Sequence, residues 1–165
     1  MARFRTSQES AAVVAAPRED VWAVLTDPVL LTRLTPFLQH IEADGDVWCW
    51  QMSPIPALGL TFVPAFTEQM SFDEPRRIDF THAPPAGARE RSGVDGWYLL
   101  EEVDGGTDLH TRLEIEVDLP VSRLASPAVT RVMDGVLGPM GTRFAHNLCD
   151  HLGIPRVRSS RVAGG

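Results

Sequence analysis

The sequence predicts an α+β fold in which a curved antiparallel sheet of about seven strands is covered by one long C-terminal helix. Three features of the sequence indicate this fold. Extended segments follow one another through the middle of the chain and are separated by turn residues. Two short helical segments come directly after the first extended segment. The last long segment, which ends near Leu152, has apolar residues at spacings of three and four.

The chain opens with a strand followed by two short helices. Residues 4–15 have an extended pattern, and Pro17, with acidic residues in the turn after it, is typical of a helix start. Asp27 and Pro28 repeat this arrangement, with the Asp side chain as the cap and Pro at the first helical position. We therefore expect a second short helix that ends near Thr35.

Hairpins connect several strands of the expected sheet. The turns Asp44-Gly45 and Asp104-Gly105 are short, and strands joined by short turns run antiparallel. The last strand alternates cleanly between apolar and polar residues, so we expect one face of the sheet to be solvated and the other to be covered. The extended segments after the two helices are 39–43, 47–52, 60–72, 77–82, 94–103 and 108–119.

The long terminal helix is expected to be capped at Ser126-Pro127 and to extend to Leu152. Its middle contains several glycines and one proline, and proline removes a backbone hydrogen bond from a helix interior. The sequence therefore predicts a kink between Gly135 and Pro139.

The remaining segments define the expected domain and its edges. We assign residues 1–153 to one domain and expect the tail, 154–165, to be disordered because it is rich in Arg, Ser and Gly. The segments 53–59 and 83–93 are expected to be exposed loops that form the rim of a ligand entrance.

Composition and charge exclude several classes of protein. The chain has 165 residues, of which 44% are hydrophobic, and a formal net charge of −7, as is usual for a folded globular protein. The chain contains Arg but no Lys, which is consistent with a GC-rich bacterial genome. The Arg residues are scattered and not clustered, so we expect no nucleic-acid partner. No segment resembles a secretion signal or a membrane-spanning helix. Cys49 and Cys149 lack metal-ligand spacing, so we expect a cytoplasmic protein with reduced thiols and with no metal or cofactor.

Two parts of the sequence resemble a known family. The pattern AP-x-E-x-VW-x-x-L-x-DP at residues 16–28, followed by Leu34 and Pro36-Phe37-Leu38, resembles the opening of the START-like (SRPBCC) superfamily, which includes polyketide cyclases and dehydrases and the birch pollen allergen. Gly105-Gly106-Thr107, an alternating strand and a long terminal helix match the later part. The resemblance covers about residues 4–152.

This resemblance implies a helix-grip fold with a cavity between the sheet and the long helix. Members of the superfamily bind lipids, sterols, polyketides, quinones or hormones, and only some are enzymes. The matched residues belong to the scaffold, so the resemblance assigns no catalytic residue. It implies a carrier, chaperone or sensor of a small hydrophobic ligand, or alternatively an enzyme of the cyclase or dehydrase kind that uses the same cavity.

Apolar side chains on the faces of the middle strands and of the helix are the candidate lining of this cavity. A single helix about 10 Å wide cannot cover a sheet of seven strands, so we expect space beneath it. Aromatic rings and flexible Met side chains suit a flat or flexible apolar ligand, although the same residues could simply fill the core. The candidates are Trp48, Trp50, Phe62, Phe66, Met70, Phe80, Met133, Leu137, Met140 and Phe144.

Few polar residues are candidates for chemistry in such a cavity. Glu68 is the one ionisable residue on the apolar face of segment 60–72, and a desolvated carboxyl there would have a raised pKa and could act as an acid or a base. Arg77 is a second candidate for steering proton transfer. A Glu at such a position more often lies at the rim of the sheet or pairs with an Arg.

Two further possibilities concern protein partners. Segment 94–103 has apolar residues on both faces, which indicates a possible homodimer surface. The tail from Arg156 to Arg161, or the exposed loops, could make the protein an interaction module.

Overall fold

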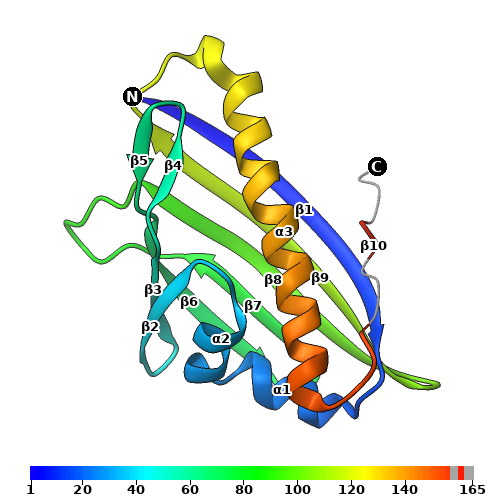
Figure 1. Cartoon of the computed structure of the whole chain (residues 1–165). Coiled ribbons are helices and arrows are strands. Elements are labelled where there is room, and N and C mark those ends of the chain that lie inside the picture. The colour runs from blue at the N-terminus through cyan, green and yellow to red at the C-terminus, as the bar shows by residue number, and fades with distance from the viewer. Residues whose placement is uncertain (157–159, 162–165) are drawn as a thin grey trace.

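The computed structural model describes residues 1–156 and 160–161. In this part of the chain, eight antiparallel strands form one curved sheet, and a long helix lies across its concave face (Figure 1). The predicted helix-grip fold is therefore confirmed. From one edge to the other, the strands are β10 (Ser160–Arg161), β1 (Ala2–Val14), β9 (Gly106–Leu119), β8 (Ser92–Val103), β7 (Arg77–His82), β6 (Ala65–Asp73), β3 (Val47–Met52) and β2 (Leu38–Asp44).

Two short helices carry the chain from β1, near one edge of the sheet, to β2 at the other edge. They are α1 (Arg18–Leu25) and α2 (Pro28–Leu34). As predicted, Asp27 caps α2, because its Oδ1 accepts hydrogen bonds from the backbone N–H groups of Val29 and Leu30 over 2.9 and 3.1 Å.

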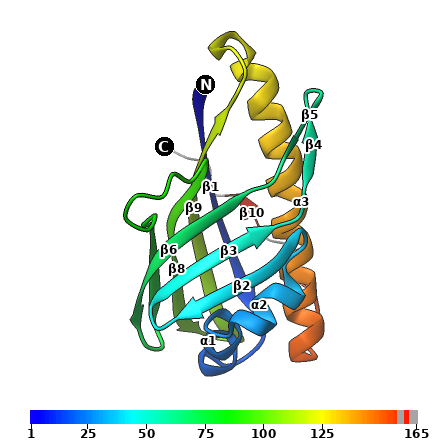
Figure 2. The same cartoon turned by 90° about the vertical axis from the view of Figure 1, so that its left-hand side faces the viewer.

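The long helix α3 (Ser126–Leu152) crosses the concave face diagonally (Figures 1 and 2). Its start differs from the prediction, because Ser126 has helical backbone angles and no side chain caps the helix. A short 3-10 helix, η1 (Arg123–Ala125), precedes it, and the hydroxyl of Ser122 caps η1 by accepting from Leu124 N–H. The helix is assigned without interruption through Pro139, so the kink stays a prediction.

The extended segment expected at 60–72 is broken in two. β4 (Ile55–Ala57) pairs with β5 (Leu60–Phe62) as a separate hairpin, so the preceding segment is not the loop that we expected. The turn at 58–59 has positive φ angles at both residues, which suits a tight hairpin. Pro64 then ends the extended segment because it has no N–H to donate to a neighbouring strand. The hairpin projects beside the first turns of α3 (Figure 2).

The hydrophobic core is divided into two clusters at opposite ends of α3. The larger cluster joins α1 and α2 to the sheet and to Phe144 and Leu148 of α3. The smaller one joins Val129 of α3 to the start of β1 and the end of β9, at Phe4 and Val117. The helix is therefore anchored at both ends, and its middle spans the space between the clusters.

Part of the tail contacts the rest of the chain. Ser160–Arg161 form β10, which pairs with β1, and Arg156 forms an ion pair with Asp150 of α3 over 2.7 Å. Residues 157–159 and 162–165 lie outside the described residues, so the expectation for them, including half of the proposed partner-binding tail from Arg156 to Arg161, stays a prediction.

Candidate ligand cavity

A cavity of about 560 Å³ lies between the concave face of the sheet and α3. Its wall is formed by six strands of the sheet, by the β4–β5 hairpin and by the helices α1, α2 and α3, and the six strands are β1, β9, β8, β7, β6 and β3. The structure places every predicted lining residue in this wall except Trp48. Those in the wall are Trp50, Phe62, Phe66, Met70, Phe80, Met133, Leu137, Met140 and Phe144.

Trp48 belongs to the core and not to the cavity. Its side chain is 3% exposed, its ring centroid lies 6.0 Å from that of Phe72, and its Nε1–H donates to the backbone oxygen of Gly45 over 3.2 Å. The prediction that it lines the cavity is wrong, because the larger core cluster already fills the end of β3 nearest the β2–β3 turn.

Aromatic stacking gives the β3–β6 wall a fixed shape. The ring of Trp50 lies nearly parallel to that of Phe66, with centroids 6.0 Å apart and an angle of 12° between the planes. Phe80 and Tyr98 form a second aromatic pair across β7 and β8, with centroids 5.3 Å apart. Because such rings have few rotatable bonds, they present large, rigid apolar surfaces to the cavity.

Sequence reasoning missed two parts of the wall, in β1 and β9. β1 contributes five residues from Gln8 to Val14, of which Glu9 is the one that is not on its inward face. The covered face of β9 contributes six residues from Leu109 to Leu119, five of them apolar. The alternation in β9 predicted a covered face, but it did not indicate that a cavity would cover part of it. Segment 53–59 also contributes to the wall, whereas Ser92 is the contributor from segment 83–93.

Glu68 supplies the cavity with a deeply buried carboxyl group. It is 2% exposed, and burial raises its pKa from the ordinary 4.5 to about 8. The nearby negative charge of Asp95 also raises this pKa, whereas the indole N–H of Trp50, which lies toward the carboxyl, lowers it. The group is therefore mostly protonated and uncharged at pH 7.

Other polar groups in the wall are also held in an apolar setting. Burial raises the pKa of Tyr98, and the charge of Glu68 raises it further, so the phenol stays protonated. Gln8 of β1 also lines the cavity, and its side-chain Nε2 has no hydrogen-bond partner among the described residues.

The model of the family described as polyketide cyclase / dehydrase and lipid transport matches residues 1–151. The chain belongs to this family. A comparison with curated proteins found no match.

Solved structures with the same fold include other members of this structural class. A conserved protein from Geobacillus kaustophilus superposes with a TM-score of 0.69 at 15% identity, covering 93% of this chain and 99% of that one. The ZhuI aromatase/cyclase from Streptomyces sp. R1128 gives 0.62 at 13% identity, covering 91% and 94%. The di-domain aromatase/cyclase StfQ of the steffimycin biosynthetic pathway gives 0.63 at 12% identity, covering 92% of this chain and 53% of that one. At these identities the likeness shows the fold.

In this member of the polyketide cyclase/dehydrase family, Arg77 does not face the cavity. It lies on the outer face of β7, where its guanidinium donates two hydrogen bonds of 2.9 Å to Asp79 and lies 5.0 Å from the ring centre of Trp97. The residues of β7 that reach inward are Ile78 and Phe80. The alternation of the strand therefore removes Arg77 as a candidate for proton transfer in the cavity.

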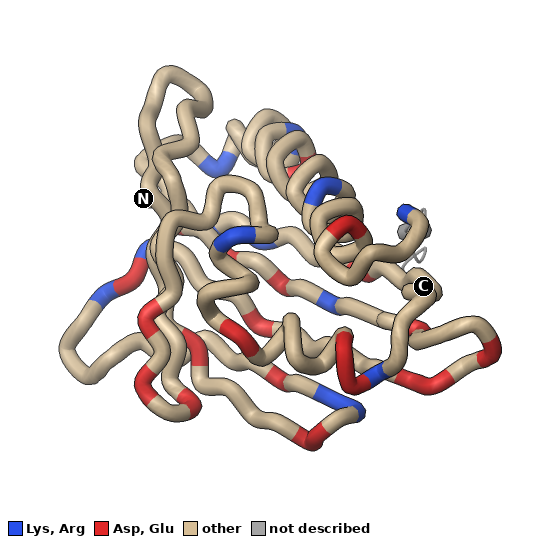
Figure 3. The backbone as a smooth tube through the Cα atoms, turned by 60° about the horizontal axis from the view of Figure 1, so that its bottom comes forward, with Lys and Arg blue, Asp and Glu red and all other residues tan. Residues whose placement is uncertain are grey.

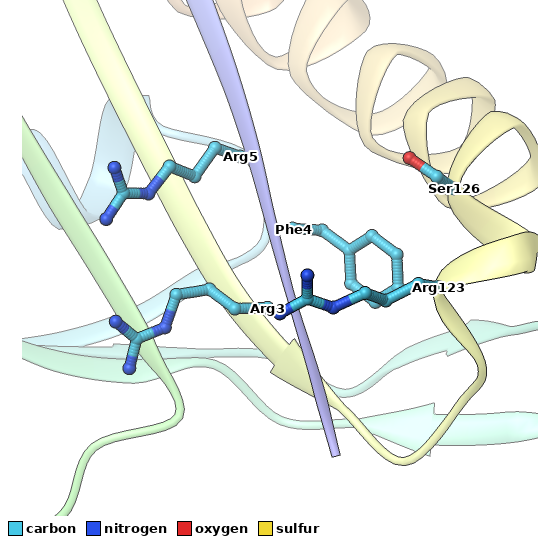
Figure 4. Close-up of a pocket in the computed structure, with 5 residues that line it drawn as sticks. All are labelled: Arg3, Phe4, Arg5, Arg123 and Ser126. Atoms are coloured by element: carbon cyan, nitrogen blue, oxygen red, sulfur yellow. The ribbon is translucent and has the colours of Figure 1, made fainter.

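A second, smaller hollow of about 290 Å³ lies at the start of β1 and α3 (Figure 4). Figure 4 shows Arg3 and Arg5 pointing to one side of β1 and Phe4 to the other. Arg3 and Arg5 both pair with Glu116 on the neighbouring strand, and Arg3 also pairs with Asp118, so two carboxylates compensate their charges within the sheet. We assign no ligand to this hollow.

The described residues show neither a metal site nor a spanning helix. No group of three or more His, Cys, Asp or Glu among them could hold a metal ion. Within the same residues, none of the helices is both long enough and apolar enough to cross a bilayer. In Figure 3 the basic positions are scattered along the backbone and interleaved with acidic ones.

Proposed function

We propose that the protein binds a small hydrophobic molecule, such as a lipid, a polyketide or an aromatic metabolite, in the cavity beneath α3. The single observation that carries this proposal is the cavity of about 560 Å³ with predominantly apolar walls. Its volume is within the range of roughly 300 to 1,000 Å³ typical of small-molecule pockets. A carrier, chaperone or sensor role requires nothing further from the site.

Packing energetics support an occupant. Protein interiors are normally close-packed, and an empty apolar cavity forfeits the dispersion contacts of the atoms that line it. Val132, Val136 and Leu137 in the middle of α3 line the cavity and belong to neither described core cluster. A bound apolar molecule would give these side chains the contacts that the protein itself does not supply.

Native mass spectrometry tests this function directly. The purified protein is incubated with separate sets of lipids, aromatic polyketides and simple aromatic metabolites, and retained mass is recorded after buffer exchange. We expect one set to remain bound at a ratio of one molecule per chain. If no member of any set is retained, the binding proposal is contradicted.

A second candidate function, a cyclase- or dehydrase-like reaction, is favoured by the position of Glu68 in the cavity wall. Its protonated carboxyl could give a proton to a leaving hydroxyl, which departs as water. The carboxylate would then take a proton from the adjacent carbon, so that a carbon–carbon double bond forms and the carboxyl is restored. In this case Glu68→Gln should retain ligand binding and lose turnover, whereas equal turnover by the variant would contradict the enzymatic role.

A cytoplasmic location, a bacterial source and a homodimer are finer parts of the same proposal. Cys49 and Cys149 are both free thiols, which supports a reducing compartment. The outward ring of Trp97, from the strand expected to form a dimer surface, is packed between Arg77 and His110. Sedimentation velocity would test the dimer, which requires a species of twice the chain mass.

A further inference from the structure

Three polar atoms of the cavity wall are buried without a hydrogen-bond partner among the described residues. One is Nε2 of Gln8 on β1, and the other two are Nε1 of Trp50 and Oε2 of Glu68. The indole N–H of Trp50 lies near enough to the carboxyl to lower its pKa, but no hydrogen bond joins Nε1 to Oε2. Both side chains line the cavity, and their strands, β3 and β6, are neighbours in the sheet. Buried polar groups are normally paired, because leaving one unpaired forfeits the hydrogen bonds that it makes with water. The described residues of the protein therefore do not complete the hydrogen bonds of the Trp50–Glu68 pair.

We propose that Trp50 Nε1 and the Glu68 carboxyl together form an anchor that binds one uncharged oxygen atom, a hydroxyl or carbonyl, of an otherwise apolar ligand. This inference rests on the proposed binding function and specifies the ligand. The oxygen accepts one hydrogen bond from the indole N–H and a second from the protonated carboxyl. The ligand thus satisfies both wall groups, and the stacking of Trp50 on Phe66 fixes the direction of the indole N–H.

The charges around the cavity exclude ionised ligand groups. No Arg is among the described residues that line the cavity, and the chain contains no Lys. A carboxylate or phosphate would therefore be desolvated without a counter-charge, next to the carboxyl of Glu68. The other acidic residue in the wall, Glu9, already pairs with His110 and Arg112 of β9. The anchor therefore selects neutral oxygenated ligands over fatty acids and phospholipids.

An ammonium ligand is disfavoured for a different reason. It would have to ionise Glu68, whose burial opposes the charged form. It would also meet the positive edge of the Trp50 indole, where the N–H group points. Both effects favour an oxygen that accepts hydrogen bonds over a cation that donates them.

Three aromatic probes of nearly equal size test the anchor. They are 2-naphthol, 2-methylnaphthalene and 2-naphthoate, and their dissociation constants are measured by competition with a fluorescent apolar dye. For each probe, the affinity is compared with its partition into apolar solvent. On this basis we expect the wild-type protein to bind 2-naphthol most tightly and 2-naphthoate most weakly.

The decisive comparison uses Trp50→Phe, which keeps an aromatic ring and removes the N–H. This variant should raise the dissociation constant of 2-naphthol by about tenfold. It should change the dissociation constant of 2-methylnaphthalene by less than about twofold. Trp97→Phe makes the same change on the outer face of β8 and should alter neither probe. Glu68→Leu, whose side chain has a similar size and no polar atoms, should also reduce the preference for 2-naphthol.

The outcomes separate the anchor from the cavity itself. Suppose that Trp50→Phe and Glu68→Leu fold and either raise the dissociation constants of the two neutral probes equally or leave that of 2-naphthol unchanged. The anchor is then overturned, while the binding function stands. If wild-type protein binds 2-naphthoate as tightly as 2-naphthol, the charge selection is overturned. If none of the probes binds to the wild-type protein, both the anchor and the cavity as a site for aromatic ligands are overturned.

Discussion

The side-chain amide of Asn147 donates a hydrogen bond to the backbone oxygen of Leu34 over 2.9 Å. It joins the last turns of α3 to the end of α2, where the final carbonyl groups of a helix have no partner within the helix. Leu148, the next residue of α3, is 1% exposed in the larger core cluster. This bond and the core cluster together hold one end of α3 against the rest of the fold.

Removal of this bond should loosen that end of the helix. We expect Asn147→Ala to lower the free energy of unfolding by about 1 kcal/mol, because it leaves the Leu34 oxygen without its partner. Urea denaturation monitored by circular dichroism measures the change. Arg143→Ala, an exposed position one turn earlier in α3, is the control and should differ from wild type by less than about 0.5 kcal/mol. Equal stability of the two variants would contradict the role assigned to Asn147.

Glu68 should make the stability of the protein depend on pH. Its pKa is about 8 in the folded protein and returns to its ordinary 4.5 when the chain unfolds. Between these values the folded state holds a proton that the unfolded state has lost, so the free energy of unfolding falls as pH rises from about 4.5 to about 8. Above pH 8 the full penalty, roughly 5 kcal/mol as an upper bound, is present.

Glu68→Gln removes this titration and keeps the side chain's shape. The variant should therefore be more stable than wild type at pH 9 by several kcal/mol, and the difference should shrink steadily as the pH is lowered toward 5. Urea midpoints measured across this range give the result. Glu101→Gln, on the exposed side of β8, should show no comparable dependence. A constant difference between Glu68→Gln and wild type at all pH values would contradict the buried, protonated carboxyl.

The fold could be predicted in detail where local chemistry decides the structure. The sequence predicts Asp27 as a cap because a carboxylate before Pro at the first helical turn has one main structural use. The alternation in β9 indicated a covered face because side chains of a strand alternate between faces. These patterns act over a few residues, so the sequence displays them directly.

The sequence predicts most apolar residues of the site, but it does not show where the core ends and the cavity begins. Alternation along β3 places Trp48 and Trp50 on the same inward face, but Trp50 lines the cavity whereas Trp48 belongs to the core. Residues of α1 and α2 share the larger core cluster with Trp48, and this packing, which alternation does not reveal, places Trp48 in the core. The prediction for Arg77 is wrong for a related reason: the sequence does not show which face of β7 is inward, and in the structure Ile78 and Phe80 occupy that face.

Filling the cavity from the helix should abolish ligand binding without unfolding the protein. Val136 lies in the middle of α3 and lines the cavity, so the indole of Val136→Trp would occupy space that a ligand needs. We expect a loss of at least about tenfold in affinity for any ligand found by native mass spectrometry. Val13→Trp makes the same substitution on the outer face of β1, where Val13 is 46% exposed, and should bind normally. Unchanged binding by Val136→Trp would show that the ligand lies elsewhere.

Glycine substitutions should distinguish a close approach between strands from an open helix surface. A Cβ at Gly96 of β8 would overlap the backbone oxygen of Arg112 and lie 2.8 Å from Cε2 of Phe80, whose ring forms part of the cavity wall. At Gly135 in α3, by contrast, a Cβ would have no described atom within 4 Å beyond its chain neighbours and the backbone of its own helix.

The two alanine variants should therefore change stability in opposite directions. We expect Gly96→Ala to lower the free energy of unfolding by about 2 to 3 kcal/mol, because the backbone oxygen of Arg112 cannot move away without breaking the β8–β9 ladder. Gly135→Ala should raise it by about 0.5 to 1 kcal/mol, because alanine loses less conformational entropy than glycine in a helix. Thermal unfolding of both variants beside wild type measures the difference. A neutral Gly96→Ala would mean that β8 and β9 can separate there at little cost, and the wall formed by Phe80 would then not be rigid.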